Sequence, residues 1–159
     1  MSKTRFTTKQ LTTAAVIAAV YAALTLLLPI PQYGGVQLRV AEAMTVLPFF
    51  FPEAIPGLAV GCFLANLLGS PFVLDWIFGT LATLAAAWLS SRAKKPWLVP
   101  LPPVALNAFI VAGVLAFTSQ MPYWPWVLSI GAGQAVACYG LGYPLLLLLR
   151  RYPRLFGRQ

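Results

Sequence analysis

Five polar side chains recur within the apolar stretches of this chain, and they are the residues best placed to do chemistry. They are Glu42, Asn66, Asp75, Asn107 and Gln134. Carboxylates accept hydrogen bonds, and carboxamides both donate and accept them, so together they suit the binding of a small polar molecule. An unpaired polar group in hydrocarbon costs on the order of 2–7 kcal/mol. A chain that keeps so few of them is expected to use them.

Catalysis is a weaker interpretation of the same residues. The chain has no histidine and only three acids, which excludes serine–histidine catalysis and imidazole-based metal sites. It has no glycine-rich phosphate loop of the P-loop type, so it is not expected to hydrolyse ATP alone. Cys62 and Cys138 fall within apolar runs and are interpreted as small buried hydrophobes. We expect neither an enzyme nor a bound cofactor or metal.

The composition predicts an all-α integral membrane protein, because 60% of the 159 residues are hydrophobic and only 9% are charged. A membrane helix needs about 20 apolar residues, so the chain has room for about six of them with short loops. We expect one six-helix transmembrane domain over residues 1–159. The expected helices are Thr8–Leu28, Arg39–Phe51, Glu53–Leu68, Asp75–Ser91 with Asp75 as its N-cap, one from between Trp97 and Val104 to Thr118, and Trp124–Arg150.

The net charge of +8 comes from clusters between and beside the apolar runs. The clusters are Lys3, Arg5 and Lys9; Arg92, Lys94 and Lys95; and Arg150, Arg151, Arg154 and Arg158. Basic loops favour the cytoplasmic side of a membrane, so six helices with this pattern predict a multi-pass protein with both termini in the cytoplasm. A basic surface divided in this way fits membrane ends in a lipid bilayer better than a nucleic-acid groove, and no nucleic-acid partner is expected.

This topology brings the polar residues of four helices to the outer half of the membrane. Arg39 and Glu42 lie at the outer end of the second expected helix, and Asn66 and Asp75 lie at the facing ends of the next two. Gln134 falls in the outer half of the last helix, and Asn107 falls nearer the middle of the fifth. The pattern predicts one polar pocket near the outer face. Two simpler alternatives remain, namely that Arg39 and Glu42 pair at i,i+3 and that Asp75 only caps its helix.

Aromatic residues near the same ends are candidates to stack on a flat ligand. Phe72 and Trp76 are the two candidates we assign to the pocket. Stacking of a base on an aromatic side chain contributes about 1–3 kcal/mol. Trp124 and Trp126 are better interpreted as interfacial aromatic residues of the membrane belt.

The first expected helix carries two rows of alanine at i,i+4 spacing. The rows are Ala14, Ala18 and Ala22, and Ala15, Ala19 and Ala23. Small residues on a membrane helix allow another helix to approach closely. The spacing alone does not separate packing within this protein from docking of a partner protein.

Several segments of the chain resemble the QueT family of queuosine-precursor transporters. The resemblance is carried by VQLRVAEAMTVLPFFFPEAIPGLAVGCFLANLLGS and LDWIFGTLATLAAA, and by PPVALNAFIVAG and GQAVACYGLGYPLLLLL. It covers nearly the whole chain. It implies an S component of a bacterial energy-coupling-factor (ECF) transporter, with the six-helix S-component fold and an outward-facing site for a 7-deazaguanine base such as queuine or a precursor.

The resemblance also implies a partner module of one transmembrane coupling protein and two cytoplasmic ATPases. In the family, an Ala-x-x-x-Ala face on the first helix docks the coupling protein, and both alanine rows match that pattern. The position of Gln134 is often Glu in the family, which puts a role for negative charge there in doubt. The alternatives are an S component for another small aromatic vitamin and a self-sufficient small-molecule carrier.

Overall fold

The computed structural model describes residues 7–31, 33 and 37–152, and this part of the chain is helical without any β-strand. The all-α prediction is therefore confirmed for these residues. Six rods follow one another along the chain. They are α1 (Thr8–Leu27); η1 (Val40–Phe49); α2 (Ala54–Gly69); α3 (Val73–Ser91); α4 (Leu101–Leu106) with η3 (Asn107–Val111) and α5 (Ala112–Ser119); and α6 (Tyr123–Ala135) with η4 (Val136–Gly142) and α7 (Tyr143–Arg151). A short turn of helix, η2 (Pro96–Leu98), precedes α4.

Four of these rods are long and apolar enough to cross a membrane. They are Thr8–Leu27, Val73–Ser91, Pro96–Ser119 and Tyr123–Arg151. The other two, η1 and α2, are shorter apolar helices. Their length, composition and number indicate a membrane protein.

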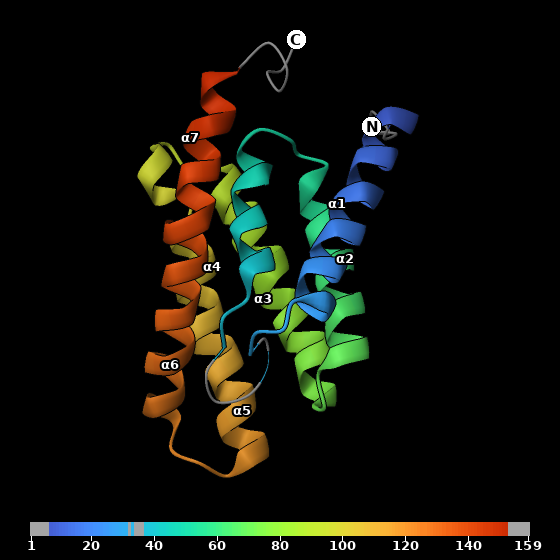
Figure 1. Ribbon diagram of the computed structural model, residues 1–159. Helices are drawn as coiled ribbons and strands as arrows, with labels where there is room; N and C mark the ends of the chain where they lie inside the picture. Colours follow the sequence, from blue (N-terminus) through green and yellow to red (C-terminus); the bar gives the residue numbers. More distant parts are fainter. Residues whose placement is uncertain (1–6, 32, 34–36, 153–159) are drawn as a thin grey trace, which may run out of the picture.

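Most of the described basic residues lie in segments at one end of the molecule. The start of α1, the connection between α3 and α4 and the end of α7 lie at one end, as Figure 1 shows. Lys9, Arg92, Lys94, Lys95, Arg150 and Arg151 belong to these segments. Lys3, Arg5, Arg154 and Arg158, which the charge argument also used, lie outside the described residues. The remaining described cation, Arg39, directly precedes η1.

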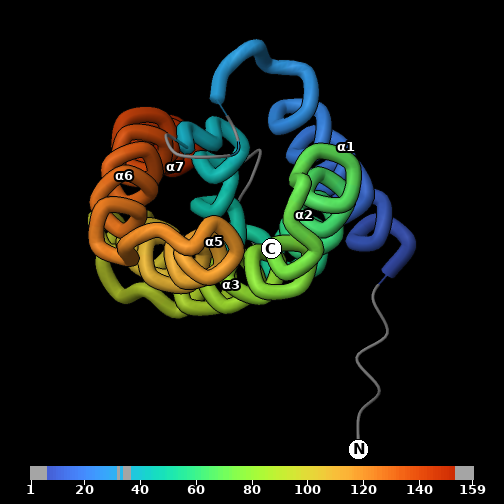
Figure 2. The backbone as a smooth tube through the Cα atoms, turned by 90° about the horizontal axis from the view of Figure 1, so that it is seen from below, coloured from blue at the N-terminus to red at the C-terminus, as the bar shows by residue number. Residues whose placement is uncertain are grey.

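The second rod differs in type from the expected α-helix, because η1 is a 3₁₀-helix of ten residues. A 3₁₀-helix rises about 2.0 Å per residue against about 1.5 Å for an α-helix, so ten residues reach about 20 Å instead of about 15 Å. Most of η1 is buried, and it contacts α1, α2, α3, η4 and α7. Figure 2 shows it between the α1–α2 side and the α6–α7 side. Side chains from η1 can therefore meet those of both sides.

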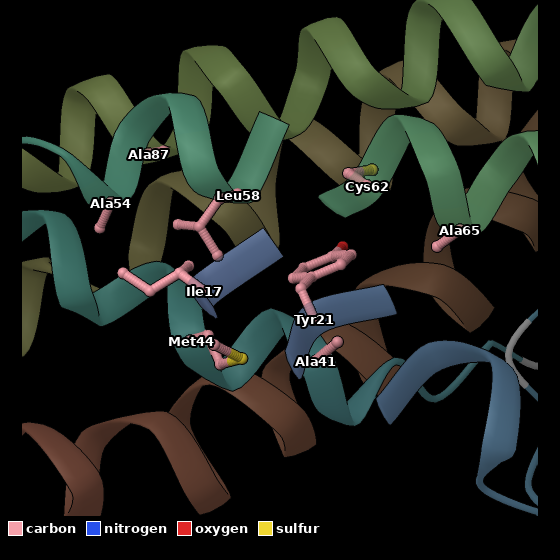
Figure 3. Close-up of a cluster of buried hydrophobic side chains, with 9 residues drawn as sticks. All are labelled: Ile17, Tyr21, Ala41, Met44, Ala54, Leu58, Cys62, Ala65 and Ala87. Atoms are coloured by element: carbon pink, nitrogen blue, oxygen red, sulfur yellow. The ribbon is translucent and has the colours of Figure 1, made fainter. Parts of the chain in front are cut away.

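Glycine and alanine bring α1 and α2 into close contact. A Cβ atom on Gly57 would lie 2.6 Å from the backbone oxygen of Ala14, and one on Gly61 would lie 2.7 Å from that of Ala18. Such small residues let membrane helices pack tightly. Beside this contact, α1, η1, α2 and α3 share an apolar cluster drawn in Figure 3, with Ile17, Tyr21 and Met44 among its members. The Tyr21 ring is fixed within this cluster.

Candidate functional site

A buried ion pair joins η1 to α3. Nη2 of Arg39 lies 3.4 Å from Oδ2 of Asp75, and the same nitrogen donates to Oδ1 of Asn66 at 2.7 Å. The Asn66 amide donates in turn to the backbone oxygen of Asp75 at 3.1 Å. The Arg39 guanidinium lies over the Tyr33 ring, 4.9 Å from its centroid. Three of the predicted residues therefore form one network that holds the guanidinium.

Tyr33 closes this network from the connection between α1 and η1. Its hydroxyl donates to the backbone oxygen of Ala65 at 2.6 Å. Burial raises the pKa of Tyr33 to about 12, so the phenol keeps its proton and remains a donor at physiological pH. The cationic face of Arg39 is thereby covered by a neutral ring, which is a favourable cation–π arrangement.

The structure overturns both simple alternatives for these residues. Asp75 does not cap α3, because Phe72 is the N-cap residue and no side chain caps that helix. Asp75 lies in the first turn instead, where its side chain faces Arg39. Glu42 is not the salt-bridge partner of Arg39, because its Oε1 atom accepts from the hydroxyls of Tyr21 and Thr83. Arg39 and Glu42 both bind residues of other helices, because η1 lies between those helices. They do not pair with each other.

Glu42 lies at the centre of a second network. Its Oε1 atom is 2.5 Å from the Tyr21 hydroxyl and 3.2 Å from the Thr83 hydroxyl. The Thr83 hydroxyl also meets the Cys62 thiol at 3.3 Å, and the Asn66 amide reaches that thiol at 3.5 Å. Side chains from α1, η1, α2 and α3 therefore form one continuous polar chain that links Glu42 to Arg39. The cysteine expected to be a plain buried hydrophobe is part of this chain.

Four buried polar atoms in this region have no hydrogen-bond partner among the described residues. They are Oε2 of Glu42, Oδ1 of Asp75, and both polar atoms of the Asn107 amide. The Asn107 side chain lies near the Glu42 carboxylate. Each unsatisfied buried group costs about 1–3 kcal/mol. Native proteins satisfy nearly all such groups, so a cluster of exceptions requires an explanation.

Asn107 and Gln134 come from the two rods that contain π-helical turns. Asn107 is the first residue of η3, and Gln134 lies one residue before the end of α6, where η4 begins. Such widened turns are rare and often occur at functional sites. The Cys138 thiol contacts the Gln134 side-chain oxygen and the Glu42 backbone oxygen, each at 3.7 Å. All six predicted polar residues are thus buried, and the Cys138 thiol links the Gln134 side chain to the Glu42 backbone.

The two predicted aromatic residues have other partners. The Trp76 indole donates to the backbone oxygen of Ser70 at 3.2 Å. Phe72 packs against the apolar cluster of Val111, Ala112, Leu115 and Ile130. The role of Phe72 and Trp76 as stacking partners of a ligand stays a prediction.

Sequence reasoning missed Tyr21, Tyr33 and Thr83. A helical stripe was available for one of them, since Asp75, Gly79 and Thr83 follow each other at i,i+4 spacing on α3. Gly79 leaves room for the polar groups, because a Cβ atom there would lie 2.5 Å from Oδ1 of Asp75. Tyr21 and Tyr33 stand alone in their segments, and no local pattern marks them.

The two alanine rows of α1 face different surroundings. Ala18 is buried against α2, and Ala14 and Ala22 are half-buried beside it. Ala15, Ala19 and Ala23 are exposed. One row therefore contributes to packing within the protein, and the other forms a smooth outer face.

The polar networks can bind and orient a ligand with several hydrogen-bonding groups. In the residues that the structure describes, no three His, Cys, Asp or Glu side chains gather closely enough to hold a metal ion. The networks offer carboxylate, carboxamide and hydroxyl groups for recognition of a ligand.

Comparison with known proteins identifies the family of this chain. The family model described as QueT transporter matches residues 11–151. The chain belongs to the QueT transporter family. A QueT relative from Lactococcus lactis subsp. cremoris (strain MG1363), named queuosine precursor transporter QueT, is 37% identical over 79 residues, which are 48% of this chain and 46% of that protein. The aligned part thus spans about half of the relative. No solved structure matches this chain.

Proposed function

We propose that the chain is the substrate-binding S component of an ECF importer and that it binds a queuosine precursor, a 7-deazaguanine base. The observation that carries the proposal is the set of unsatisfied atoms on Glu42 and Asn107, fully buried among apolar helices. Membership of a transporter family and the presence of several membrane-length helices support it. Arg39, Asn66, Asp75 and Gln134 surround these two residues and complete the proposed site.

The chemistry of a guanine-like edge suits these two residues. That edge presents an adjacent ring N–H and amino group, followed by a carbonyl oxygen. A carboxylate has about four acceptor positions, and Oε1 of Glu42 already uses two of them. Oε2 remains to accept from the two ligand donors, while the Asn107 amide nitrogen donates to the carbonyl. The ligand would satisfy groups that otherwise remain buried without partners.

Glu42 suits this role better than Asp75. The Asp75 carboxylate is compensated by the Arg39 guanidinium, and its network orders η1 against α3. The Glu42 carboxylate has no cation paired with it in the described contacts, and it accepts from the neutral hydroxyls of Tyr21 and Thr83. We assign Glu42 to the guanine-like edge, and Asp75 with Arg39 to the support of the site.

Entry of the ligand requires movement, because Glu42 and Asn107 have no exposed surface. The backbone oxygen of Gln37, just before η1, lies so close to Gly133 on α6 that a Cβ atom would overlap it. Separation of this contact would open a path between η1 and α6 toward Glu42. We propose that the site opens there, at the end of the molecule opposite the basic clusters.

The basic end of the molecule is proposed to face the cytoplasm, in line with the positive-inside rule. Both termini would then lie inside a bacterial cell membrane, and the site would open outward. The partner module in this proposal is one transmembrane coupling protein and two cytoplasmic ATPases. The exposed row of Ala15, Ala19 and Ala23 is the proposed docking face, because the other row is already in contact with α2.

Calorimetry on the purified protein tests the ligand. Queuine and its deazaguanine precursors are expected to bind in a 1:1 ratio, whereas vitamins without a guanine-like edge are not. Glu42→Gln is expected to weaken binding by about 1.5–3 kcal/mol, and Glu53→Gln serves as the matched control outside the site. Tight binding of another aromatic vitamin would replace the proposed ligand. Uptake into vesicles that contain this chain without any partner module would instead show a self-sufficient carrier.

A further inference from the structure

A long apolar groove follows the lipid-facing side of α3. One part, of about 700 Å³, is lined by Leu81, Trp88 and Ile55 among other apolar residues. A second part, of about 390 Å³, is lined by Leu74 and Phe117 among others, and the two parts share Phe78 and Ile110. The groove therefore runs along α3 from Leu74 to Trp88.

The groove is long enough to hold the acyl chain of a lipid in one leaflet. From Leu74 to Trp88 the helix rises about 21 Å over its fourteen steps, which exceeds the roughly 15 Å of half the hydrocarbon core. The large side chains along it are exposed, with Phe78 at 45%, Leu81 at 51% and Trp88 at 47%. An extended hydrocarbon chain is the occupant whose shape and polarity match such a surface.

The charge at one end of the groove specifies the head group. The Arg92 guanidinium lies over the Trp88 ring, 4.5 Å from its centroid, which places a cation directly beyond the last apolar residue of the groove. Lys94 and Lys95 follow in the same connection and are exposed. Tryptophan is common at membrane interfaces, and cations at that level attract the phosphates of anionic lipids.

Nothing in the described structure neutralises these cations. The chain has only three acids, and two of them, Glu42 and Asp75, are buried in the polar networks. The third, Glu53, forms no ion pair with Arg92, Lys94 or Lys95 among the described contacts. The three positive charges remain available to a partner of opposite charge.

We propose that this face binds an anionic phospholipid, with its acyl chain along α3 and its phosphate and head group at Arg92, Lys94 and Lys95. The site is separate from the polar networks around Glu42. It does not depend on the proposed substrate or partner module.

Native mass spectrometry of the purified full chain tests this proposal. Equal amounts of phosphatidylglycerol and phosphatidylcholine with the same acyl chains are added, and the bound lipids are counted. Preferential retention of phosphatidylglycerol is expected. Arg92→Gln/Lys94→Gln should reduce that preference by roughly fivefold for each charge removed. Arg150→Gln/Arg151→Gln, which removes two charges from α7 at the same end, should leave it unchanged.

A second variant tests the groove itself. Ala85→Trp fills the part lined by Leu81 and Trp88 without a change of charge, and it should lower the retention of both lipids. Equal retention of the two lipids by the wild-type chain overturns the proposal, as does an equal loss in the Arg150/Arg151 control. If Ala85→Trp retains as much lipid as the wild-type chain, the groove is not part of the lipid site. The charge variants lie at exposed positions, so they decide the head-group assignment even where Ala85→Trp lowers the yield.

Discussion

Nη2 of Arg39 lies 3.4 Å from Oδ2 of Asp75, although 36 residues separate them along the chain. Both side chains are almost completely buried. A buried ion pair needs additional hydrogen bonds to offset the loss of water, and Asn66 supplies one of them to the guanidinium. This pair fixes η1 against the start of α3, while Glu42, three residues further along η1, accepts hydrogen bonds from the hydroxyls of Tyr21 and Thr83.

Removal of one partner of this pair should destabilise the fold. Asp75→Asn leaves a buried guanidinium without a counter-ion, and such changes cost about 3–5 kcal/mol. The double variant Arg39→Gln/Asp75→Asn should recover part of that loss, because no charge is then buried alone. Thermal unfolding of the two single variants and the double variant measures the coupling. Strictly additive losses would show that the pair does not act as a unit.

Glu42→Gln should weaken binding of a deazaguanine by about 1.5–3 kcal/mol, the usual contribution of hydrogen bonds to a charged group. The unfolding temperature should change little, because the carboxamide oxygen can still accept from Tyr21 and Thr83. Calorimetry and a thermal scan on the same sample separate the two effects. Wild-type affinity in this variant would exclude Glu42 from the site.

Gln134→Glu should shift ligand preference toward a precursor with a cationic aminomethyl arm. The side chain is buried near Cys138 and Glu42, so an added carboxylate there would favour a positive group on the ligand. The ratio of affinities for queuosine precursors with and without the cationic arm measures the shift. An unchanged ratio would show that Gln134 does not select between them.

Ala19→Trp should impair assembly with the coupling protein, whereas Ala18→Trp should impair folding of the isolated chain. Ala19 is exposed on the proposed docking face, so tryptophan there should block co-purification with the coupling protein while the isolated chain still binds ligand. Ala18 is buried against Gly61, so tryptophan there should unfold or destabilise the isolated chain. Pull-down and thermal scans distinguish the two. Normal assembly of Ala19→Trp would move the docking face elsewhere.

Gly133→Ala should disturb the entrance to the site. Its added methyl group would overlap the Gln37 backbone oxygen, so the segment before η1 would be displaced from α6. Faster ligand dissociation is expected, because the closed contact is weakened. Gly140→Ala, seven residues later in the same rod, is the control, since its nearest neighbour is 4.0 Å away. Identical dissociation rates in both variants would place the entrance elsewhere.

The sequence by itself determined the number and approximate limits of the rods and six of the polar residues that the structure buries among them. Hydropathy is a local property, and an uninterrupted apolar run between prolines, glycines and charges defines a membrane helix without reference to the rest of the chain. The same reasoning selected Arg39, Glu42, Asn66, Asp75, Asn107 and Gln134, because a polar residue in such a run is conspicuous. Three of the six rods, α1, α2 and α3, are α-helical throughout, and π-helical turns interrupt the last two.

Only the tertiary structure decided how these residues are paired. The partner of Arg39 depends on the approach of α3 to η1, and the choice between two alanine rows depends on the rotation of α1 against α2. The 3₁₀ form of η1 and the role of Tyr21 likewise depend on neighbours distant in the chain. Such contacts arise from packing between elements, which no local pattern of residues encodes. The sequence therefore determined several of the buried polar groups, and the fold determined which of their atoms have a hydrogen-bond partner.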